Sequence, residues 1–287
     1  MTEGPPLIFD RKTIALRRER ARRSESDAFL ARMAAQGIGE RLAAVKRSFE
    51  NGYVLDTSDG AMVILDDWAR QWDYATAGEK EALPPAYESN DLAISVLSLQ
   101  TVNDLPGVLR QLLHVLKPDG LFLAAMFCSE TLTELRQSLA AAEIETTGGV
   151  SPRVAPFADV RDLGGLLQRA GFALPVADVE RTVVRYGDFM ALVHDLRALG
   201  ETNALVERSR KPIRRAMLAA TAQHYAENFS DPDGKLRATF DIVYLTGWAP
   251  HESQQRPLVP GSAKARLADA LGTRELRSGD APPKRQR

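Results

Sequence analysis

Cysteine is nearly missing from this chain of 287 residues, since Cys128 is the only one present. One thiol excludes internal disulfides and sites that need paired thiols, and it suits a reducing compartment. Apolar runs long enough to span a bilayer are also missing. The first residues lack the apolar core of a secretory signal and the arginine-rich character of a transit peptide. These absences predict a cytoplasmic, bacterial protein with no membrane span.

Charge of either sign is not in excess, because the formal net charge at pH 7 is −1. Such a balance gives no overall basis for binding nucleic acid. The basic residues are nevertheless unevenly spread, with seven of them between Arg11 and Arg23 against one acid, Glu19. We predict that residues 1–24 form a solvated, partly helical basic arm. The hydrophobic content of 44% is enough for a large core in one elaborated α/β domain.

Signatures of metal-dependent or nucleophilic catalysis are missing as well. His251 and Glu252 begin like a zinc-binding helix, but Gln255 stands where the second histidine is needed. The other histidines stand singly in predicted helices, at His114, His194 and His224. The sequence has no nucleophile elbow or phosphate loop. Cys128 follows an apolar run, which indicates a small packed side chain. We therefore predict no metal site.

The spacing of apolar residues predicts the central elements of an α/β fold. A helix is expected over about residues 25–49, with a break at Gly37 and Gly39. A buried strand, a helix and a second buried strand are then expected over residues 91–98, 108–116 and 121–127. This order indicates a βαβ unit with parallel strands.

Helices dominate the second half of the predicted fold. They are expected over residues 132–143, 159–170, 188–199 and 209–229, followed by a strand over residues 239–248. Thr131 and Glu134 have the spacing of a capping box, and Gly171 suits the end of the second helix. We interpret residues 188–229 as a helical cap on a domain of residues 25–271. A disordered tail over residues 272–287 is expected to follow.

Two interpretations remain for the segment around Asp56 and Gly60. In the first, a buried strand ends at Asp56, and Gly60 is the remaining glycine of a nucleotide-binding loop. In the second, the same residues form a plain β-hairpin. We favour the hairpin slightly, because the turn over residues 58–60 is too short for a crossover helix. It predicts adjacent antiparallel strands near residues 53–56 and 61–66.

A family resemblance emerges from several longer segments. Three segments resemble motifs of the class I S-adenosylmethionine-dependent methyltransferases. They are Glu79-Lys-Glu-Ala-Leu-Pro84, residues 91–106 and Leu116-Lys-Pro-Asp-Gly120. Residues 148–157, Leu199-Gly-Glu-Thr-Asn203 and residues 247–257 narrow the match. They resemble the methyltransferase-fold family of the mitochondrial complex I assembly factor that hydroxylates an arginine, with its α-proteobacterial relatives. The resemblance runs from about Phe9 to Leu271 and implies a Rossmann-like α/β fold with a helical cap.

The resemblance also implies which residues contact the cofactor, S-adenosyl-L-methionine. It makes Asp56 and Gly60 parts of the first motif, assigns Glu79 to the adenine, and lines the methionine end with Ser95 and with Leu97 to Gln100. The acid that holds the ribose in the family would correspond to Asp66 or Asp67. The alternative is that both are aspartates of a hairpin end or turn.

The sequence departs from the family pattern at the same site. Ser58 and Met62 replace glycines, so their side chains are expected to fill space that the cofactor needs. Gln100 and Thr101 stand where relatives usually show His-Trp. The first helix, with its amide donors and dipole, is expected to be deleted. We therefore expect weak or absent cofactor binding.

Two classes of function follow from the resemblance. The first is S-adenosylmethionine-dependent protein modification, by methylation or hydroxylation, linked to respiratory complex I assembly. The alternative is a pseudoenzyme that has lost the cofactor and serves as an assembly or scaffold protein. In either class we expect the cap and the loop with His251, Glu252, Gln254 and Arg256 to form a surface that contacts a protein partner or substrate.

Overall fold

A six-stranded sheet organises the protein, with strand order β2-β1-β3-β4-β6-β5. Its strands are β1 (Phe49–Leu55), β2 (Ala69–Ala75), β3 (Asn90–Val96), β4 (Leu116–Cys128), β5 (Ala173–Tyr186) and β6 (Leu236–Trp248). The first four are mutually parallel, and β6 runs antiparallel to both of its neighbours. The computed structural model describes residues 6–23, 28–84, 87–255, 269 and 272–273, and the sheet lies in a unit that ends at His251.

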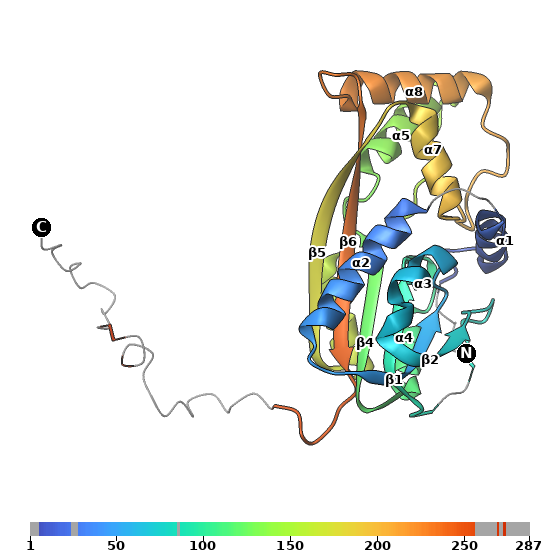
Figure 1. The fold of residues 1–287 in the computed structure, drawn as a ribbon. Coiled ribbons are helices and arrows are strands. Elements are labelled where there is room, and N and C mark those ends of the chain that lie inside the picture. The colour runs from blue at the N-terminus through green and yellow to red at the C-terminus, as the bar shows by residue number, and fades with distance from the viewer. Residues whose placement is uncertain (1–5, 24–27, 85–86, 256–268, 270–271, 274–287) are drawn as a thin grey trace, which may run out of the picture. The chain divides into compact units, whose positions relative to one another are not determined.

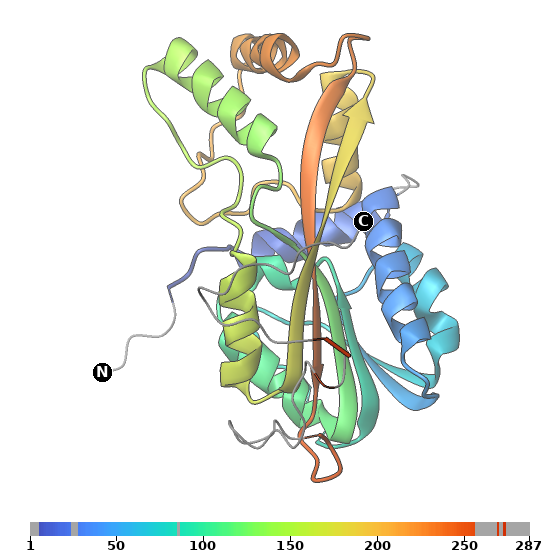
Figure 2. The same cartoon turned by 90° about the vertical axis from the view of Figure 1, so that its left-hand side faces the viewer.

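Helices cover both faces of this sheet. They are α1 (Arg11–Arg22), α2 (Phe29–Ala44), α3 (Asp59–Leu65), α4 (Leu105–Val115), α5 (Thr133–Thr147), α6 (Val160–Ala170), α7 (Phe189–Ala198) and α8 (Arg215–Phe229). Successive residues of a strand point to opposite faces, so β1 places Val54 in one hydrophobic core and Leu55 in the other. The first core lies under α2 and α3, and the second under α4 and α6 (Figures 1 and 2). The predicted Rossmann-like α/β fold is confirmed.

The cap consists of α5, α7 and α8, which gather beyond the carboxyl end of β4 (Figure 1). The β5–β6 hairpin extends from the sheet and supports it. The Tyr225 hydroxyl of α8 donates a hydrogen bond to the Arg237 carbonyl at 2.7 Å. The predicted capping box is wrong, because α5 begins after Leu132 and the Glu134 carboxylate accepts the Thr239 amide hydrogen at 3.1 Å.

The expected hairpin near Asp56 is also wrong. Residues 59–65 form α3, and β1 pairs with β2 in parallel. The connection between these strands includes α3 and spans residues 56–68, about the dozen residues that a parallel crossover needs. In α3 the buried and exposed positions follow a helical pattern, with Ala61 and Leu65 in the core and Val63 82% exposed. A short apolar run in a sequence does not distinguish a buried helix from a strand. Here the segment forms a helix that is buried on one face.

Some of the other expectations from the sequence are confirmed, and some elements were not predicted. The βαβ unit of β3, α4 and β4 is confirmed, and Gly171 ends α6 with a φ of 101°. The strands β2 and β5 were not predicted, since exposed and half-buried residues predominate in both. The predicted disordered tail falls outside the described residues except at positions 272 and 273.

The expected break of the second helix at Gly37 and Gly39 is wrong, because α2 is continuous from Phe29 to Ala44. Gly37 instead allows the Tyr244 ring to lie directly against the helix backbone, in a place that a Cβ atom would occupy. The Arg41 guanidinium covers the same ring, 3.6 Å from its centroid. The glycine is therefore needed for close packing of α2 on β6.

A pair of substitutions in α2 tests this explanation. Gly37→Ala is expected to lower the free energy of unfolding by about 1–3 kcal/mol, because the ring and backbone must separate. Gly39→Ala is the matched control, since its Cβ would meet only Trp68 Nε1 at 3.7 Å. The better helix propensity of alanine is expected to raise stability there by up to about 1 kcal/mol. Urea unfolding of both variants measures the difference, and equal effects would contradict the packing role of Gly37.

Candidate active site

The carboxyl ends of β1 and β3 form the point at which the chain changes direction across the sheet. From β1 the chain crosses to β2 on one side, and β3 then pairs with β1 on the other. In open α/β sheets ligands bind in the crevice at such a switch point. A cavity of about 220 Å³ lies here, lined by Asp56, Ser58 and Gly60 after β1, by Val96 and Leu97 at the end of β3, and by residues of α1, α2 and α7.

The backbone is strained at this edge of the sheet. Asp56, Leu97 and Ser129 directly follow β1, β3 and β4, and their φ angles are 48°, 49° and 45°. Positive φ is unfavourable for residues other than glycine and persists where the surrounding structure imposes it. Such strain is frequent at functional sites, and here it repeats at three adjacent strand ends.

Hydroxyl groups hold the ends of β1 and β3 together. Ser95 Oγ donates to the Leu55 carbonyl at 3.2 Å, and Thr57 Oγ1 accepts the Val96 amide hydrogen at 3.1 Å. Ser98 Oγ lies 2.5 Å from Ser95 Oγ. Ser95 is fully buried, so it fixes the shape of the cavity floor without lining the cavity.

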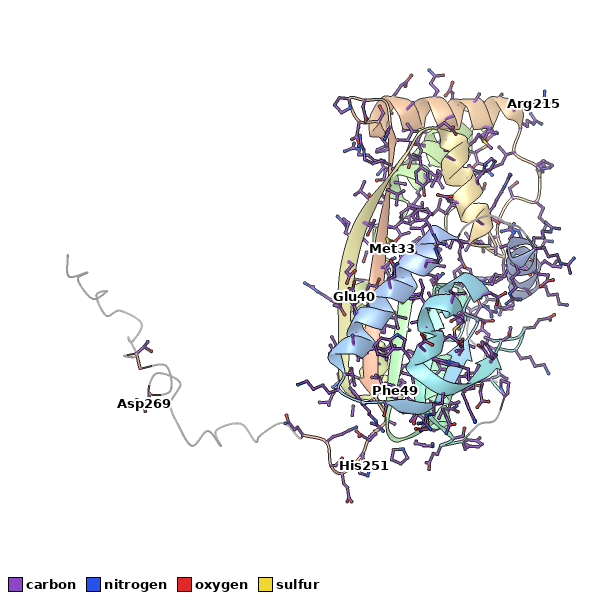
Figure 3. The ribbon with its side chains drawn as sticks, in the orientation of Figure 1. Met33, Glu40, Phe49, Arg215, His251 and Asp269 are labelled. Carbon is purple, nitrogen blue, oxygen red and sulfur yellow. The ribbon has the colours of Figure 1, made fainter. Side chains whose placement is uncertain are left out.

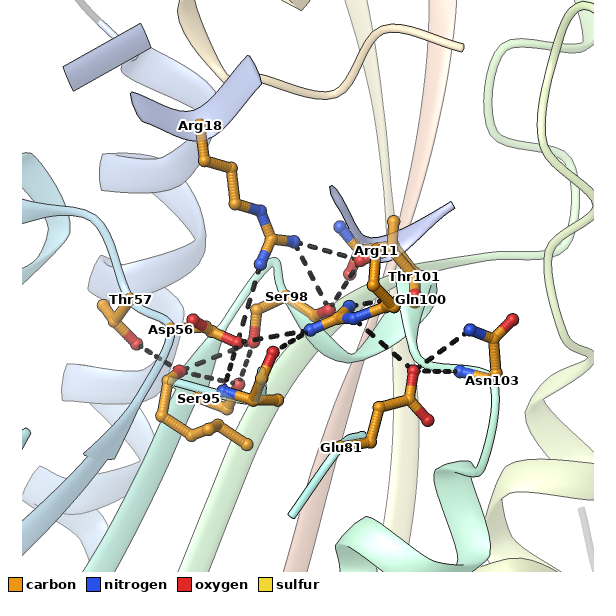
Figure 4. A network of polar contacts seen from close by, with 12 residues as sticks. Arg11, Arg18, Asp56, Thr57, Glu81, Ser95, Ser98, Gln100, Thr101 and Asn103 are labelled. Atoms are coloured by element: carbon orange, nitrogen blue, oxygen red, sulfur yellow. Dashed lines mark hydrogen bonds and ion pairs between the residues drawn. The ribbon is translucent and has the colours of Figure 1, made fainter. Parts of the chain in front are cut away.

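Two arginines of α1 reach into the switch point, as Figure 4 shows. The Arg11 guanidinium donates to the carbonyls of Thr101 and Ala77, and it lies 3.8 Å from Asp56 Oδ2. Arg18 lies at the same distance from this carboxylate. The Arg11 side chain is 7% exposed, and burial lowers its pKa. Within the predicted solvated, partly helical arm, residues 11–22 are helical and mostly exposed or half-buried, but Arg11 and Ile14 are buried.

The start of the chain is also tied to the segment after α7. The amide hydrogen of Asp10 is donated to the Ala204 carbonyl at 2.8 Å, and Phe9 forms an antiparallel bridge with Leu205. Arg18 donates to Glu201 Oε1 at 3.2 Å. The N-terminal segment thus joins the sheet to the cap across the candidate site.

Glu81, not Glu79, is the buried acid of the segment that follows β2. Its carboxylate lies 3.5 Å from Arg11 Nε and accepts amide hydrogens from Asn103 and Asp104 at 2.8 and 2.7 Å. Glu79, which the family pattern assigns to the adenine, has a side chain 60% exposed and pairs with Lys12 at 3.4 Å. Sequence reasoning missed Glu81 because two acids of equal chemistry lie two residues apart.

The space near Gly60 remains open. A Cβ atom added at Gly60 would meet nothing within 4 Å. Ser58 lines the cavity, and its hydroxyl is buried with no hydrogen-bond partner among the described residues. Met62 lies in the hydrophobic core with residues of α2 and does not line the cavity. The expectation that its side chain fills space needed by the cofactor is therefore wrong. With α3 in place, the residues present fit a polar ligand.

Leu97 lines this cavity, whereas Gln100 turns back to the strand end. The Gln100 amide nitrogen donates to the Leu97 carbonyl at 2.8 Å. Its amide oxygen is buried and has no partner in the described part of the chain. Asp66 and Asp67 are exposed and precede β2, which places them at the amino edge of the sheet as turn aspartates. They lie beside Phe49 and Glu50 at the start of β1, so the length of that strand separates them from the switch point.

The predicted partner loop begins at this opposite edge. His251 follows β6, whose last residue Trp248 pairs with Leu121 in the first half of β4. Figure 3 shows His251 at the end of the sheet away from Arg215 of α8. The cap lies at the other end of this 13-residue strand, roughly 40 Å away. The cap and His251 therefore do not form one surface, contrary to expectation. Glu252 is exposed and Gln254 half-buried, and Arg256 lies outside the described residues.

The remaining candidate groups are structural. Cys128 is fully buried, as predicted, and burial raises the pKa of its thiol to about 11. His224 Nδ1 lies 3.1 Å from Ser138 Oγ between two cap helices. No cluster of metal-ligating side chains occurs among the residues that the structure describes. Within the same residues, no helix combines the length and the apolar character needed to cross a membrane.

A second cavity, of about 470 Å³, lies between the strand ends and the cap. Its walls are mainly apolar and include Phe127, Phe157 and Phe189. Thr101 and Glu201 contribute to its lining, and both accept hydrogen bonds from Arg18, at 3.1 and 3.2 Å. Because Arg18 lines the first cavity, its contacts form the wall between the two.

The fold and a cavity at the switch point define a class of protein, and comparison with known proteins agrees. Residues 28–175 match the family model described as a methyltransferase domain, and the chain belongs to this family. The YcgJ protein of Bacillus subtilis has the same fold, with a TM-score of 0.50 at 10% identity over 75% of this chain and 99% of that one.

Two named relatives are similar in sequence. The mitochondrial arginine hydroxylase NDUFAF5 of Dictyostelium discoideum is 45% identical over 186 residues, which are 65% of this chain and 43% of that protein. The malonyl-[acyl-carrier protein] O-methyltransferase of Xylella fastidiosa is 35% identical over 219 residues, 75% of this chain and 72% of that protein. The chain spans about half the length of the arginine hydroxylases that it matches, from 43% to 62%. The family resemblance seen in the sequence is confirmed.

Proposed function

We propose that the chain is an S-adenosylmethionine-binding protein that modifies a side chain of a protein substrate. The name of its arginine hydroxylase relatives suggests that this side chain is an arginine. The observation that carries the proposal is the pair of cavities separated by Arg18. One lies at the switch point and has charged side chains such as Arg18 and Asp56 in its wall, and the other is mainly apolar and lies under the cap. Two neighbouring sites of this character suit a polar cofactor and a substrate side chain.

The cavity at the switch point offers groups for both ends of the cofactor. Asp56 is an acceptor for hydroxyl or ammonium hydrogens, and Arg18 is a cation suited to a carboxylate. The unpartnered Ser58 hydroxyl is a further hydrogen-bonding group. When bound, S-adenosylmethionine supplies an electrophilic methyl group on its sulfonium. The role of Glu79 at the adenine remains a prediction, since the exposed Glu79 side chain is outside the cavity lining.

The apolar cavity suits the aliphatic part of a long side chain. An arginine has three methylene groups that pack on aromatic walls such as Phe127 and Phe157, while its guanidinium needs an acid. Glu201 is the acid in this lining, with a side chain 11% exposed. The protein would therefore orient the substrate through Glu201 and exclude water through the cap.

A variant that fills the open space tests the cofactor part of the proposal. Gly60→Leu adds a side chain where a Cβ has no neighbour, so the fold is expected to tolerate it. Calorimetry with S-adenosylmethionine is expected to give a Kd in the micromolar range, and Gly60→Leu to weaken it at least tenfold, about 1.4 kcal/mol. Val63→Phe adds bulk on the exposed side of α3 and is the matched control.

Each result has a defined meaning. Absence of binding to the wild-type chain would reject the cofactor proposal and leave the non-catalytic assembly protein. Equal binding by wild type and Gly60→Leu would move the cofactor away from this cavity. Mass spectrometry of a candidate substrate then separates the reactions, because hydroxylation adds an oxygen atom and methylation adds a methylene unit.

A second candidate function is methylation of a carboxylate presented by an acyl carrier protein. It is favoured by the relative from Xylella fastidiosa, of which the chain covers 72%. Transfer of a methyl group to malonyl-loaded carrier protein would support it.

A link to respiratory complex I assembly is implied by the family resemblance, and co-purification with complex I subunits tests it. A cytoplasmic address remains a prediction, since the arginine hydroxylase relatives are named as mitochondrial.

A further inference from the structure

A basic cleft lies outside the two cavities, between α1, α7 and the segment that precedes α8. It has a volume of about 900 Å³. Its described lining contains no aspartate or glutamate, whereas arginine and lysine occur at seven positions: Arg17, Arg20, Arg153, Arg197, Arg208, Arg210 and Lys211. For a chain with a net charge of −1, this is a strong local excess of one sign. The cleft therefore favours an anionic ligand.

Most of these cations are not neutralised by the protein. Arg153 pairs with Glu143 at 2.6 Å, and Arg208 pairs with Asp10 at 3.0 Å. In the described part of the chain the other cations of the cleft make no ion pair. Arg17 differs from them, because its Nη1 is buried without a hydrogen-bond partner among the described residues. A buried guanidinium nitrogen without a partner is costly, and an anion in the cleft would remove that cost.

The cleft continues into the apolar cavity. Arg153, Val193 and Arg197 line both, and so do Gly200 and Ile213. A ligand that occupies the cleft can therefore place one side chain in the apolar cavity while its anionic groups remain among the arginines. This continuity connects the cleft to the site at which a substrate side chain is expected.

The number and arrangement of charges decide between ligand classes. One carboxylate is satisfied by one or two arginines in bidentate geometry, so seven cations exceed the need of a single-headed amphiphile. A membrane surface is flat and does not enter a concave cleft. Single-stranded nucleic acid binds on stacked aromatic side chains, and in the described lining the only ring is that of His194. A peptide chain with several carboxylates supplies enough negative charge, can enter a concave cleft and needs no aromatic rings.

We propose that the cleft binds an acidic segment of a protein, in which aspartate and glutamate residues flank the side chain that enters the apolar cavity. The identity of the entering residue rests on the proposed function, but binding of the acidic residues does not. Electrostatic complementarity of this kind sets the association rate and the choice of partner, and it weakens with salt. The inserted side chain then fixes the register of the segment.

The full-length chain is tested without cofactor, so that a failure of catalysis does not affect the result. The probe is a fluorescent peptide with one arginine between runs of aspartate and glutamate, and its control replaces the acids by asparagine and glutamine. Fluorescence anisotropy is expected to show at least tenfold tighter binding of the acidic peptide. Binding is expected to weaken as ionic strength rises from about 0.1 M to about 1 M, where the Debye length falls from about 10 Å to about 3 Å.

Charge reversal locates the binding. Arg197→Glu with Lys211→Glu changes two exposed cations of the cleft and is expected to reduce acidic peptide affinity at least tenfold. Arg110→Glu with Arg169→Glu makes the same change of charge at exposed positions on α4 and α6 and is expected to leave affinity within twofold. Equal losses in both variants, no loss in either, or equal binding of the neutral peptide would overturn the proposal. The proposal would also be overturned if anionic vesicles or an RNA oligonucleotide bound more tightly than the acidic peptide, and if Arg197→Glu with Lys211→Glu abolished that binding while the control variant did not.

Discussion

Replacement of Arg11 by methionine is expected to lower the free energy of unfolding by about 3–5 kcal/mol. Arg11 lies 3.5 Å from Glu81 and 3.8 Å from Asp56, and these carboxylate side chains are only 7% and 5% exposed. Removal of one partner from a buried ion pair leaves a charge that is shielded from water. Arg18 and the amides of Asn103 and Asp104 compensate Asp56 and Glu81 only in part. The carbonyls of Thr101 and Ala77 also lose their donor. For a domain of this size the loss corresponds to a fall in Tm of roughly 10 °C.

The neighbouring residue provides the control. Lys12 pairs with Glu79 at 3.4 Å, but the two side chains are 73% and 60% exposed. An exposed pair contributes little, so Lys12→Met is expected to change stability by less than about 0.5 kcal/mol. Urea unfolding of the two variants compares a buried and an exposed ion pair on one helix. Similar effects would show that α1 does not dock in the switch point.

Glu143→Gln is expected to lower stability at neutral pH by about 3 kcal/mol. The Glu143 carboxylate accepts hydrogen bonds from Arg153 Nε and Nη2 at 3.0 and 2.6 Å, and from the Ser151 amide at 2.9 Å. The hydrogen bond of Arg153 is the largest cause that lowers the pKa of Glu143 from 4.5 to about 2. A shift of this size corresponds to about 3 kcal/mol of preference for the ionised form.

The same shift predicts the pH at which this contribution disappears. The folded protein binds the proton of Glu143 less tightly than the unfolded chain, so ionisation favours the folded state. The contribution is complete above a pH of about 4.5 and is lost as the pH falls to about 2. The stabilities of wild type and Glu143→Gln are therefore expected to converge on acidification. Glu145→Gln, at an exposed position of α5, is expected to match wild type throughout, and a constant gap for Glu143→Gln would contradict the assigned pKa.

The sequence predicted most reliably those parts whose burial is signalled by the chain itself. The strand at Asn90–Val96 contains the apolar residues Leu92 to Ile94 and Val96, and α4 ends before a proline and a glycine. Their βαβ unit was therefore evident. In Ala61 to Leu65 the apolar residues are also contiguous, but only the contact with α2 makes them a helix. Local pattern did not contain that contact, which is why the hairpin interpretation was wrong.

The candidate site shows the same limit. Asp56, Gly60 and Leu97 do line the cavity, since strand ends and loops are marked in the sequence. Arg11 and Glu81 were missed as site residues, because their burial depends on the docking of α1 some seventy residues away in the chain. A pairing over such a separation leaves no periodic trace. The family resemblance located the switch point, but it did not reveal what covers it.

The attachment of the first helix has a consequence for how the protein forms. Phe9 and Asp10 bond to Leu205 and Ala204, so the start of the chain pairs with residues synthesised much later. Closing so long a loop requires the intervening sheet and α7 to be in place first. The N-terminal segment is thus expected to dock last during synthesis, once the strands and α7 that hold it are in place. The charged groups at the switch point stay hydrated until this final step, which delays the finished site until folding of the rest is complete.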